Sequence, residues 1–65
     1  MENRILELRK KAGLRQTDIA KELGIVQSAV SAWETGQGNP RIEHLPKLAE
    51  MLHCTIDEIF RTAHQ

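Results

Sequence analysis

The chain is poor in the residues that stabilise or anchor many other classes of protein. It has a single cysteine, Cys54, so no internal disulfide can form and a reducing cytoplasm is the expected compartment. No apolar run approaches the length of a signal peptide or a membrane span. With 65 residues there is room for one domain, residues 1–65, and none for a second lobe that would form an active-site cleft. We therefore expect a single soluble domain.

The sequence also lacks the residue combinations that enzymes and metal sites need. No histidine is paired with a nucleophile, and no glycine-rich phosphate loop is present. Zinc ligands of the right type exist, but their spacing fits no tetrahedral pattern, and the adjacent His53 and Cys54 would point about 100° apart on a helix. These potential ligands are His44, His53, Cys54 and His64. The sequence therefore predicts no enzyme, metal site, cofactor or small-molecule ligand.

The chain has no excess of charge of either sign, whereas a DNA-binding domain is often strongly basic. The charges are nevertheless unevenly distributed along the sequence. Residues 1–41 carry seven basic and five acidic side chains, and residues 42–65 carry two basic and four acidic ones. A polarised molecule can present a positive face to phosphate groups. A net charge of zero therefore does not exclude a nucleic acid as the partner.

Apolar residues recur at helical spacing in five short segments, and no segment alternates as a strand does. The expected helices run from about Glu2 to Ala12, Gln16 to Leu23, Gln27 to Glu34, His44 or Leu45 to Leu52, and from Thr55 onward. Gly24 and Gly36 follow the second and third helices, where a left-handed residue ends a helix. Pro46 suits a first turn, and Thr55 with Glu58 forms a capping box. We expect a compact all-α domain of five helices.

The stretch from residue 16 to 35 carries the most specific pattern. Two short helices are joined through Gly24, and the small residue Ala20 lies where closely crossing helices leave little room. Val30 and Trp33 are three residues apart, so they lie on one face of the second helix and can pack it against the first. This arrangement predicts a helix-turn-helix.

The sequence resembles the Cro/cI-like helix-turn-helix family of phage and bacterial repressors from about Ile5 to Phe60. The matching positions are Leu8-Arg9, Gly13-Leu14, Gln16, Ile19-Ala20, Leu23-Gly24-Ile25, Gln27-Ser28, Val30-Ser31, Trp33-Glu34, Gly36, Pro40, Leu48-Ala49 and Leu52. The resemblance implies a repressor-like domain that binds double-stranded DNA in a sequence-specific manner. It also implies that the third helix enters the major groove with its N-terminal end leading, and that the protein regulates transcription.

The third helix has an outward side that suits contact with bases. At 100° per residue, Val26, Val30, Trp33 and Glu34 are expected on the core side, and Gln27 lies at the leading tip. A glutamine there can both accept and donate a hydrogen bond, as the N6 and N7 edge of adenine requires, and an alanine methyl group can pack on a thymine methyl group. The expected base-contacting residues are Gln27, Ser28, Ser31 and Ala32.

A second contact zone is expected around the start of the second helix, whose backbone N–H groups favour an anion. The resemblance implies that Gln16 binds a backbone phosphate and braces Gln27, and that Arg9 forms an internal salt bridge with Glu34. Basic side chains near this end suit sequence-independent phosphate contact. The expected phosphate-contacting residues are Gln16, Arg15, Lys10, Lys11 and Arg41.

The sequence departs from the family at the positions just before the second and third helices. Arg15 and Val26 replace the usual Ser or Thr cap, and each missing cap costs on the order of 1 kcal/mol of stability.

The C-terminal segment predicts a dimer. Ile56, Ile59 and Phe60 are three large apolar side chains on a very short helix, and one small core is not expected to cover them all. The expected dimer interface is therefore Ile56, Ile59 and Phe60, together with the adjoining end of the fourth helix. A homodimer would also double the few base pairs that one helix reads. The alternative is a helix-turn-helix that binds another protein, as an antitoxin-like partner does, which the zero net charge favours.

Overall fold

The computed structural model describes residues 3–60, and within this range it contains only helices, turns and loops. The helices are α1 (Ile5–Lys11), α2 (Gln16–Leu23), α3 (Gln27–Thr35), η1 (Ile42–His44), α4 (Leu45–Met51) and α5 (Ile56–Phe60). The prediction of five α-helices is confirmed. The periodicity did not predict η1, because a single 3-10 turn is too short to show a repeat. The expected start of α1 at Glu2 lies outside the described residues, and the helix begins at Ile5.

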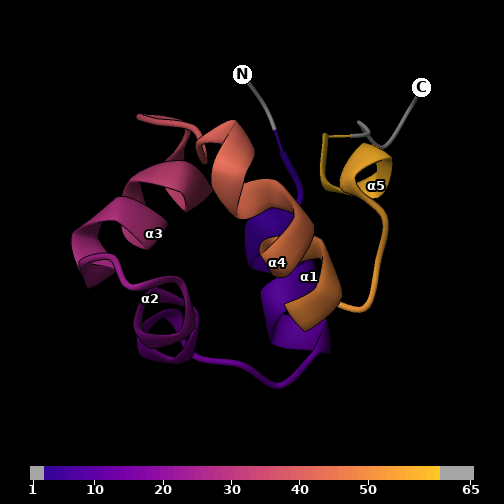
Figure 1. The fold of residues 1–65 in the computed structure, drawn as a ribbon, viewed down its shortest axis with the longest axis horizontal. Coiled ribbons are helices and arrows are strands. Elements are labelled where there is room, and N and C mark those ends of the chain that lie inside the picture. Colours follow the sequence, from indigo (N-terminus) through magenta and orange to yellow (C-terminus); the bar gives the residue numbers. More distant parts are fainter. Residues whose placement is uncertain (1–2, 61–65) are drawn as a thin grey trace.

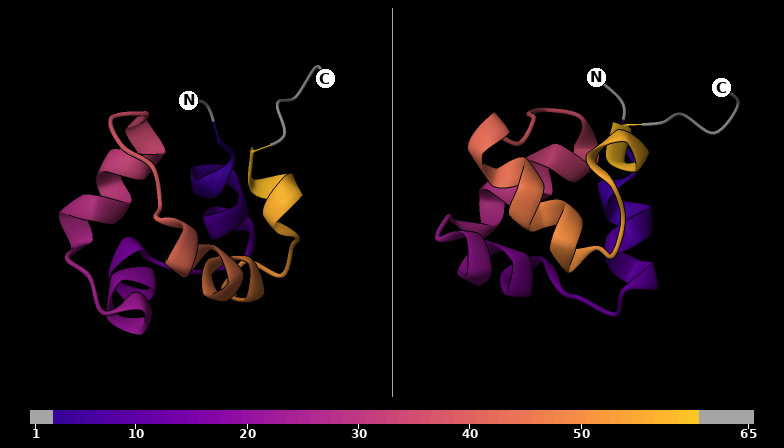
Figure 2. Two further views of the ribbon diagram at one scale, coloured as in Figure 1. Left: turned by 45° about the horizontal axis from the view of Figure 1, so that its top comes forward. Right: turned by 45° about the vertical axis from the view of Figure 1, so that its right-hand side comes forward.

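In the view of Figure 1, α1 and α4 occupy the middle of the molecule. α2 and α3 lie together on one side of the molecule, and α5 lies on the other side, beyond α1 and α4 (Figures 1 and 2). α3 therefore occupies an outer edge of the fold while its inner side packs on the core. No helix among the described residues is long and apolar enough to cross a membrane.

The core draws on all five α-helices. Its buried members are Ile5, Leu8, Ile19, Ala20, Val30, Trp33, Leu48, Ala49, Leu52 and Ile59. Trp33 is 6% exposed, so the prediction that it belongs to the core is confirmed. Burial of this apolar surface is the main term that stabilises so short a chain.

The turn between α2 and α3 has the geometry that its glycine predicts. Gly24 has a φ of 70°, in the left-handed region that a residue with a Cβ adopts at a cost. The backbone N–H of Ile25 then donates to Ala20, 2.9 Å away, which closes the end of α2. Gly36 ends α3 in the same way, with a φ of 83°. The predicted helix-turn-helix is therefore present.

Two expectations about burial are wrong. Val26 is 68% exposed rather than on the core side, because it caps α3 in an extended conformation and helical periodicity does not apply to it. Ile59 is fully buried in the protein's own core, so it is not available for a dimer interface. Its burial follows from the docking of α5 against the start of α1, where the Arg4 N–H donates to the Ile59 carbonyl at 2.7 Å. Ile56 and Phe60 remain exposed and half-buried, respectively.

Candidate nucleic-acid interface

The start of α2 is held by Arg15 and Asp18. Asp18 Oδ2 accepts a hydrogen bond from the Arg15 backbone N–H at 2.8 Å, which is the contact of a capping box. This hydrogen bond, together with the Arg15 guanidinium 3.3 Å away, lowers the pKa of Asp18. The Arg15 side chain is 81% exposed. Such an ion pair is weak in water, so the guanidinium can turn to a phosphate group at little cost.

The N-terminal end of α3 carries the exposed polar side chains. Gln27 is the first residue of the helix and is exposed, as is Ser28, while Ser31 is half-buried. Ala32 is half-buried for a different reason. A Cβ on Gly38 would lie only 3.7 Å from the Ala32 methyl group, so this methyl faces the loop after α3. Ala32 is therefore a poorer candidate for base contact than the sequence suggested.

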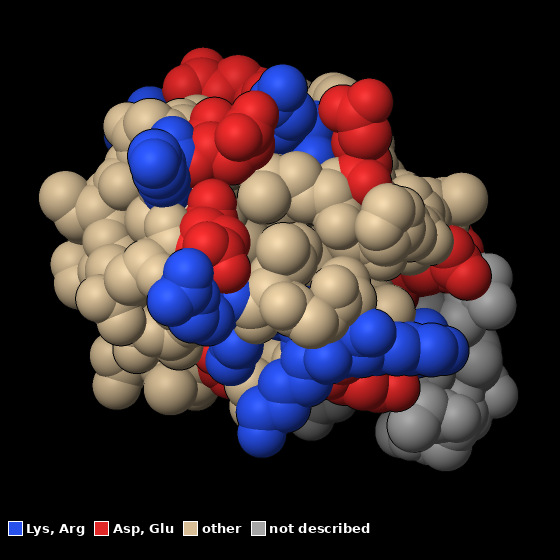
Figure 3. All heavy atoms as spheres, turned by 90° about the horizontal axis from the view of Figure 1, so that it is seen from below, with Lys and Arg blue, Asp and Glu red and all other residues tan. Residues whose placement is uncertain are grey.

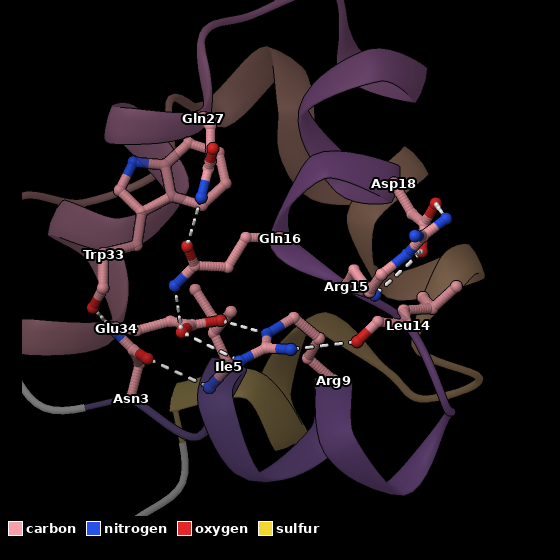
Figure 4. A network of polar contacts seen from close by, with 10 residues as sticks. All are labelled: Asn3, Ile5, Arg9, Leu14, Arg15, Gln16, Asp18, Gln27, Trp33 and Glu34. Atoms are coloured by element: carbon pink, nitrogen blue, oxygen red, sulfur yellow. Dashed lines mark hydrogen bonds and ion pairs between the residues drawn. The ribbon is translucent and has the colours of Figure 1, made fainter.

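Gln27 is connected to the interior by a row of side chains (Figure 4). Its Nε2 donates to Gln16 Oε1 at 3.0 Å. Gln16 Nε2 in turn donates to Glu34 Oε1 at 2.8 Å. Gln16 comes from α2, whereas Gln27 and Glu34 come from α3, so the hydrogen bonds join the two helices of the helix-turn-helix. The expected brace between Gln16 and Gln27 is confirmed.

The row ends on an ion pair between α1 and α3. The Arg9 guanidinium donates to both oxygens of Glu34, and Nη1 also donates to the Leu14 carbonyl at 2.9 Å. The Arg9 side chain is 13% exposed and that of Glu34 is 5% exposed. The predicted internal salt bridge is confirmed. Arg9, Glu34, Gln16 and Gln27 thus form one network, which we call the interior network.

The fold and this arrangement match a known family. A family model described as "Helix-turn-helix" (HTH_3) matches residues 5–59, which is most of the chain. The chain belongs to the Cro/C1-type helix-turn-helix family. This is a family of transcriptional regulators without enzymatic activity, in agreement with the prediction from the sequence.

Three relatives share the same percentage of identical residues with this chain. The chain is 34% identical to the HTH-type transcriptional activator BcrR of Enterococcus faecalis over 86% of its length. It is 34% identical to the cryptic phage CTXphi transcriptional repressor RstR of Vibrio cholerae over 91%, and 34% identical to Repressor protein C2 of Salmonella phage P22 over 94%. The chain spans 28% of BcrR, 53% of RstR and 28% of Repressor protein C2. The chain thus spans only part of the length of these relatives, between 28% and 53%.

Basic side chains flank the helix-turn-helix without covering it. Lys10 near the end of α1 and Arg41 at the cap of η1 are both exposed. On the face shown in Figure 3, basic side chains gather at the lower edge and alternate with acidic ones along the upper edge, with uncharged side chains between. This face therefore offers phosphate groups a limited number of cations rather than a continuous basic surface.

Lys11 does not lie with the other basic residues expected at the interface. It lines a cavity of about 310 Å³ between α1, the turn after α4 and α5, together with Arg4, His53 and Glu58. Arg9 and Lys11 are two residues apart, so they project from different faces of α1, and only Arg9 points to α3. The contact of Lys11 with a phosphate group therefore stays a prediction, from a different face of α1 than the one Arg9 uses. Burial raises the pKa of the Cys54 thiol, which also lines this cavity.

The potential metal ligands that the structure describes do not form a metal site. Among residues 3–60, no group of three His, Cys, Asp or Glu side chains could hold a metal ion. His64 lies outside the described residues.

One residue of the site was missed at the level of sequence. The Asn3 side chain donates from Nδ2 to the Trp33 carbonyl of α3 and accepts from the Ile5 N–H, both at 3.0 Å (Figure 4). Asparagine is common near the start of a helix, so Asn3 signals that α1 begins shortly after it, although the N-cap residue itself is Arg4. The contact of Asn3 with Trp33, 30 residues away, leaves no trace in a sequence pattern.

Proposed function

We propose that this chain binds duplex DNA in a sequence-specific manner and represses transcription, with the N-terminal end of α3 in the major groove. The observation that supports this most strongly is the interior network. It holds an exposed glutamine amide at the tip of α3 through two successive hydrogen bonds that lead back to a buried ion pair. A fixed polar group at an exposed helix tip is what base recognition requires, because reading depends on hydrogen bonds of defined direction.

The network also sets the direction in which Gln27 presents its groups. Glu34 as a carboxylate only accepts hydrogen bonds, so Gln16 must turn its amide nitrogen toward it and its carbonyl oxygen toward Gln27. Gln27 therefore donates one N–H to Gln16 and keeps its carbonyl oxygen and the second N–H for a partner. That pair of groups matches the N6 and N7 edge of adenine. We propose adenine as the base that Gln27 reads.

The remaining contacts divide into base and phosphate contacts. Ser28 and Ser31 supply hydroxyl groups on the outer side of α3, which suit either a base edge or a phosphate group. Gln16 has a second amide N–H to offer at the start of α2, where backbone N–H groups also favour an anion. Arg15, Lys10 and Arg41 complete the proposed phosphate contacts, whose role is independent of sequence.

We further propose that the protein acts as a homodimer on cytoplasmic DNA. The chain has zero net charge, and one helix reads only a few base pairs, so a single copy gains little binding energy. Ile56 is 39% exposed on α5, and Phe60 is half-buried beside it. α5 lies on the side away from α2 and α3 (Figure 1), which leaves it accessible when α3 contacts DNA. A two-fold dimer would place its two copies of α3 about 34 Å apart, one turn of duplex.

DNA binding is tested by selecting a preferred site from a random duplex pool and measuring fluorescence polarisation on it. We expect a preferred site, and an affinity that falls steeply between about 50 and 200 mM salt. An absence of affinity for any duplex would refute the proposal and favour a module that binds another protein. A promoter fusion carrying the selected site then distinguishes repression, which we expect, from activation.

The dimer is tested by light scattering with and without a palindromic form of the selected duplex. Ile56→Glu should reduce two-to-one complexes, because it places a charge in the proposed interface. Leu6→Glu is the matched control, since Leu6 is also 39% exposed but lies on α1. A strict one-to-one complex, or equal behaviour of both variants, would contradict the dimer.

A further inference from the structure

Asn3 connects the start of α1 to the far end of α3. Its carboxamide uses both of its polar ends, since Oδ1 accepts from the Ile5 N–H and Nδ2 donates to the Trp33 carbonyl, each at 3.0 Å. The first bond satisfies one of the free N–H groups at the beginning of α1. The second reaches one of the last carbonyls of α3, which otherwise accepts only from the Gly36 N–H at 3.3 Å. One side chain thus caps one helix and attaches it to another.

Within residues 3–60, this contact is the second of two side-chain polar contacts that join α3 to α1 and the residues just before it, beside their apolar packing in the core. The first is the ion pair of Arg9 with Glu34, the residue next to Trp33. A single attachment leaves α3 able to pivot about it, whereas two attachments that leave from different points define the angle between the helices. Asn3 and Arg9 are six residues apart in sequence, which corresponds to roughly 9 Å along a helix. They therefore hold the same turn of α3 from two separated positions (Figure 4).

The angle of α3 matters because a small tilt of the helix displaces its N-terminal tip, where Gln27 lies. Gln27 lies six residues from Trp33, or roughly 9 Å along the helix axis, so a tilt of about 6° moves the tip by about 1 Å. Hydrogen bonds to bases tolerate little change, because their donor–acceptor distances span only about 0.5 Å. Contacts with the phosphate backbone by long, flexible side chains tolerate more. A loose α3 would consequently lose discrimination between sequences before it loses general affinity for DNA.

The same short segment also reaches α5. The Arg4 backbone N–H donates to the Ile59 carbonyl at 2.7 Å, directly beside the Asn3 contact with α3. Residues 3 and 4 therefore tie α3 and α5 to the beginning of α1. This fixes the segment from both sides and makes it a firm support for the Trp33 contact.

We propose that Asn3 is a positioning residue for DNA sequence recognition, which holds α3 at its reading angle through the Trp33 carbonyl. The proposal rests on the proposed function, because it assigns Asn3 to the same reading helix. It predicts that Asn3 acts on specificity without touching DNA. A purely structural role would lower stability but change the affinities for preferred and random duplex equally.

The test compares Asn3→Ser with Thr55→Ala. A serine at position 3 can still cap α1 but is too short to reach the Trp33 carbonyl. Thr55→Ala removes the capping box of α5, in which Thr55 Oγ1 accepts from the Glu58 N–H at 3.1 Å, and so destabilises the protein away from α3. We expect Asn3→Ser to reduce the ratio of affinities for selected and random duplex about three- to tenfold, the effect of one net hydrogen bond. Thr55→Ala should leave this ratio unchanged when the duplex carries a single half-site, because the proposed dimer contact of α5 does not form there.

A second measurement needs no DNA. Residual dipolar couplings of backbone amides report the angle between α1 and α3 in each protein, and this angle should change in Asn3→Ser but not in Thr55→Ala. An unchanged angle between α1 and α3 in Asn3→Ser would overturn the proposal. So would an affinity ratio in Asn3→Ser equal to that of the wild type, provided that the wild type discriminates between selected and random duplex. A wild type that shows no discrimination would refute the proposed function instead, and the couplings would then decide the role of Asn3 alone.

Discussion

Replacing Arg9 by alanine should be among the most damaging single changes in this protein. The Glu34 side chain is 5% exposed and would keep Gln16 as its remaining partner in the interior network. Removing one member of a fully buried ion pair costs about 3–5 kcal/mol, because the other charge is left uncompensated, and for this largely buried pair, with Arg9 13% exposed, that range is an upper bound. A 65-residue domain has a total stability of about 3–10 kcal/mol. We therefore expect Arg9→Ala to be largely unfolded or to melt far below the wild type.

A double variant separates stability from recognition. Arg9→Met with Glu34→Leu replaces the buried pair by apolar side chains of similar volume, a change that is often neutral or stabilising. We expect this variant to regain most of the wild-type stability. It removes the carboxylate that orients Gln16, however, so Gln16 can turn either way and Gln27 loses its fixed direction. The ratio of affinities for selected and random duplex should then fall about tenfold, within the range of one bidentate base contact.

Both effects are measurable with the same proteins. Trp33 is the only tryptophan and is buried, so its fluorescence reports unfolding in urea. Lys10→Ala is the matched control, because Lys10 is adjacent to Arg9 but exposed, and its stability should match the wild type. The reasoning is refuted if Arg9→Ala unfolds at the same urea concentration as the wild type. It is also refuted if the double variant is stable and keeps the full affinity ratio.

Three further changes test other parts of the structure. Gln27→Ala should cost about 1–3 kcal/mol of discrimination at one base pair while affinity for random duplex persists, which competition binding measures and an unchanged preference would contradict. Gly38→Ala should stabilise the protein by about 0.4–1 kcal/mol, because the new Cβ would make ordinary contacts with Ala32 at 3.7 Å and Trp33 at 3.9 Å. Gly24→Ala should destabilise the protein by about 1–2 kcal/mol, because Gly24 has a φ of 70°. Urea titrations that show the opposite order of stability would refute this. Asp18→Ala should lower the melting temperature at pH 7, and the difference in melting temperature from the wild type should shrink as the pH falls below about 4. The reason is that a carboxylate whose pKa is lowered in the folded state stabilises the protein only while it is ionised. A difference in melting temperature that does not depend on pH would contradict this.

Local chemistry made most of the fold predictable from the sequence. The glycines that end α2 and α3, the proline in the first turn of α4 and the capping box at Thr55 act within a few residues of themselves. Their effects are therefore visible in the sequence. The resemblance to a known family supplied the longer contacts, namely the ion pair of Arg9 with Glu34 and the brace between Gln16 and Gln27. These contacts join different helices and leave no periodic signal.

The errors have a common physical origin. Helical periodicity placed Val26 inside, but it stands one residue before the helix in an extended conformation. Counting apolar residues on α5 placed Ile59 outside, but the hydrogen bond from Arg4 draws that helix onto the core. In both cases a local rule was applied where it does not hold: helical periodicity one residue outside a helix, and a count of apolar residues where tertiary packing decides burial.

Recognition and stability share the same groups in this domain. The carboxylate of Glu34 balances the Arg9 charge in the interior and also sets the direction of the Gln16 amide. A substitution that disturbs the ion pair must therefore alter what the tip of α3 presents, even though neither residue is proposed to touch DNA. The reverse does not hold, because Gln27 lies at the exposed end of the network and can change without uncovering a buried charge. Specificity can thus vary at Gln27 at little cost in stability, whereas changes at Arg9 or Glu34 must be compensated in the partner before the chain can fold.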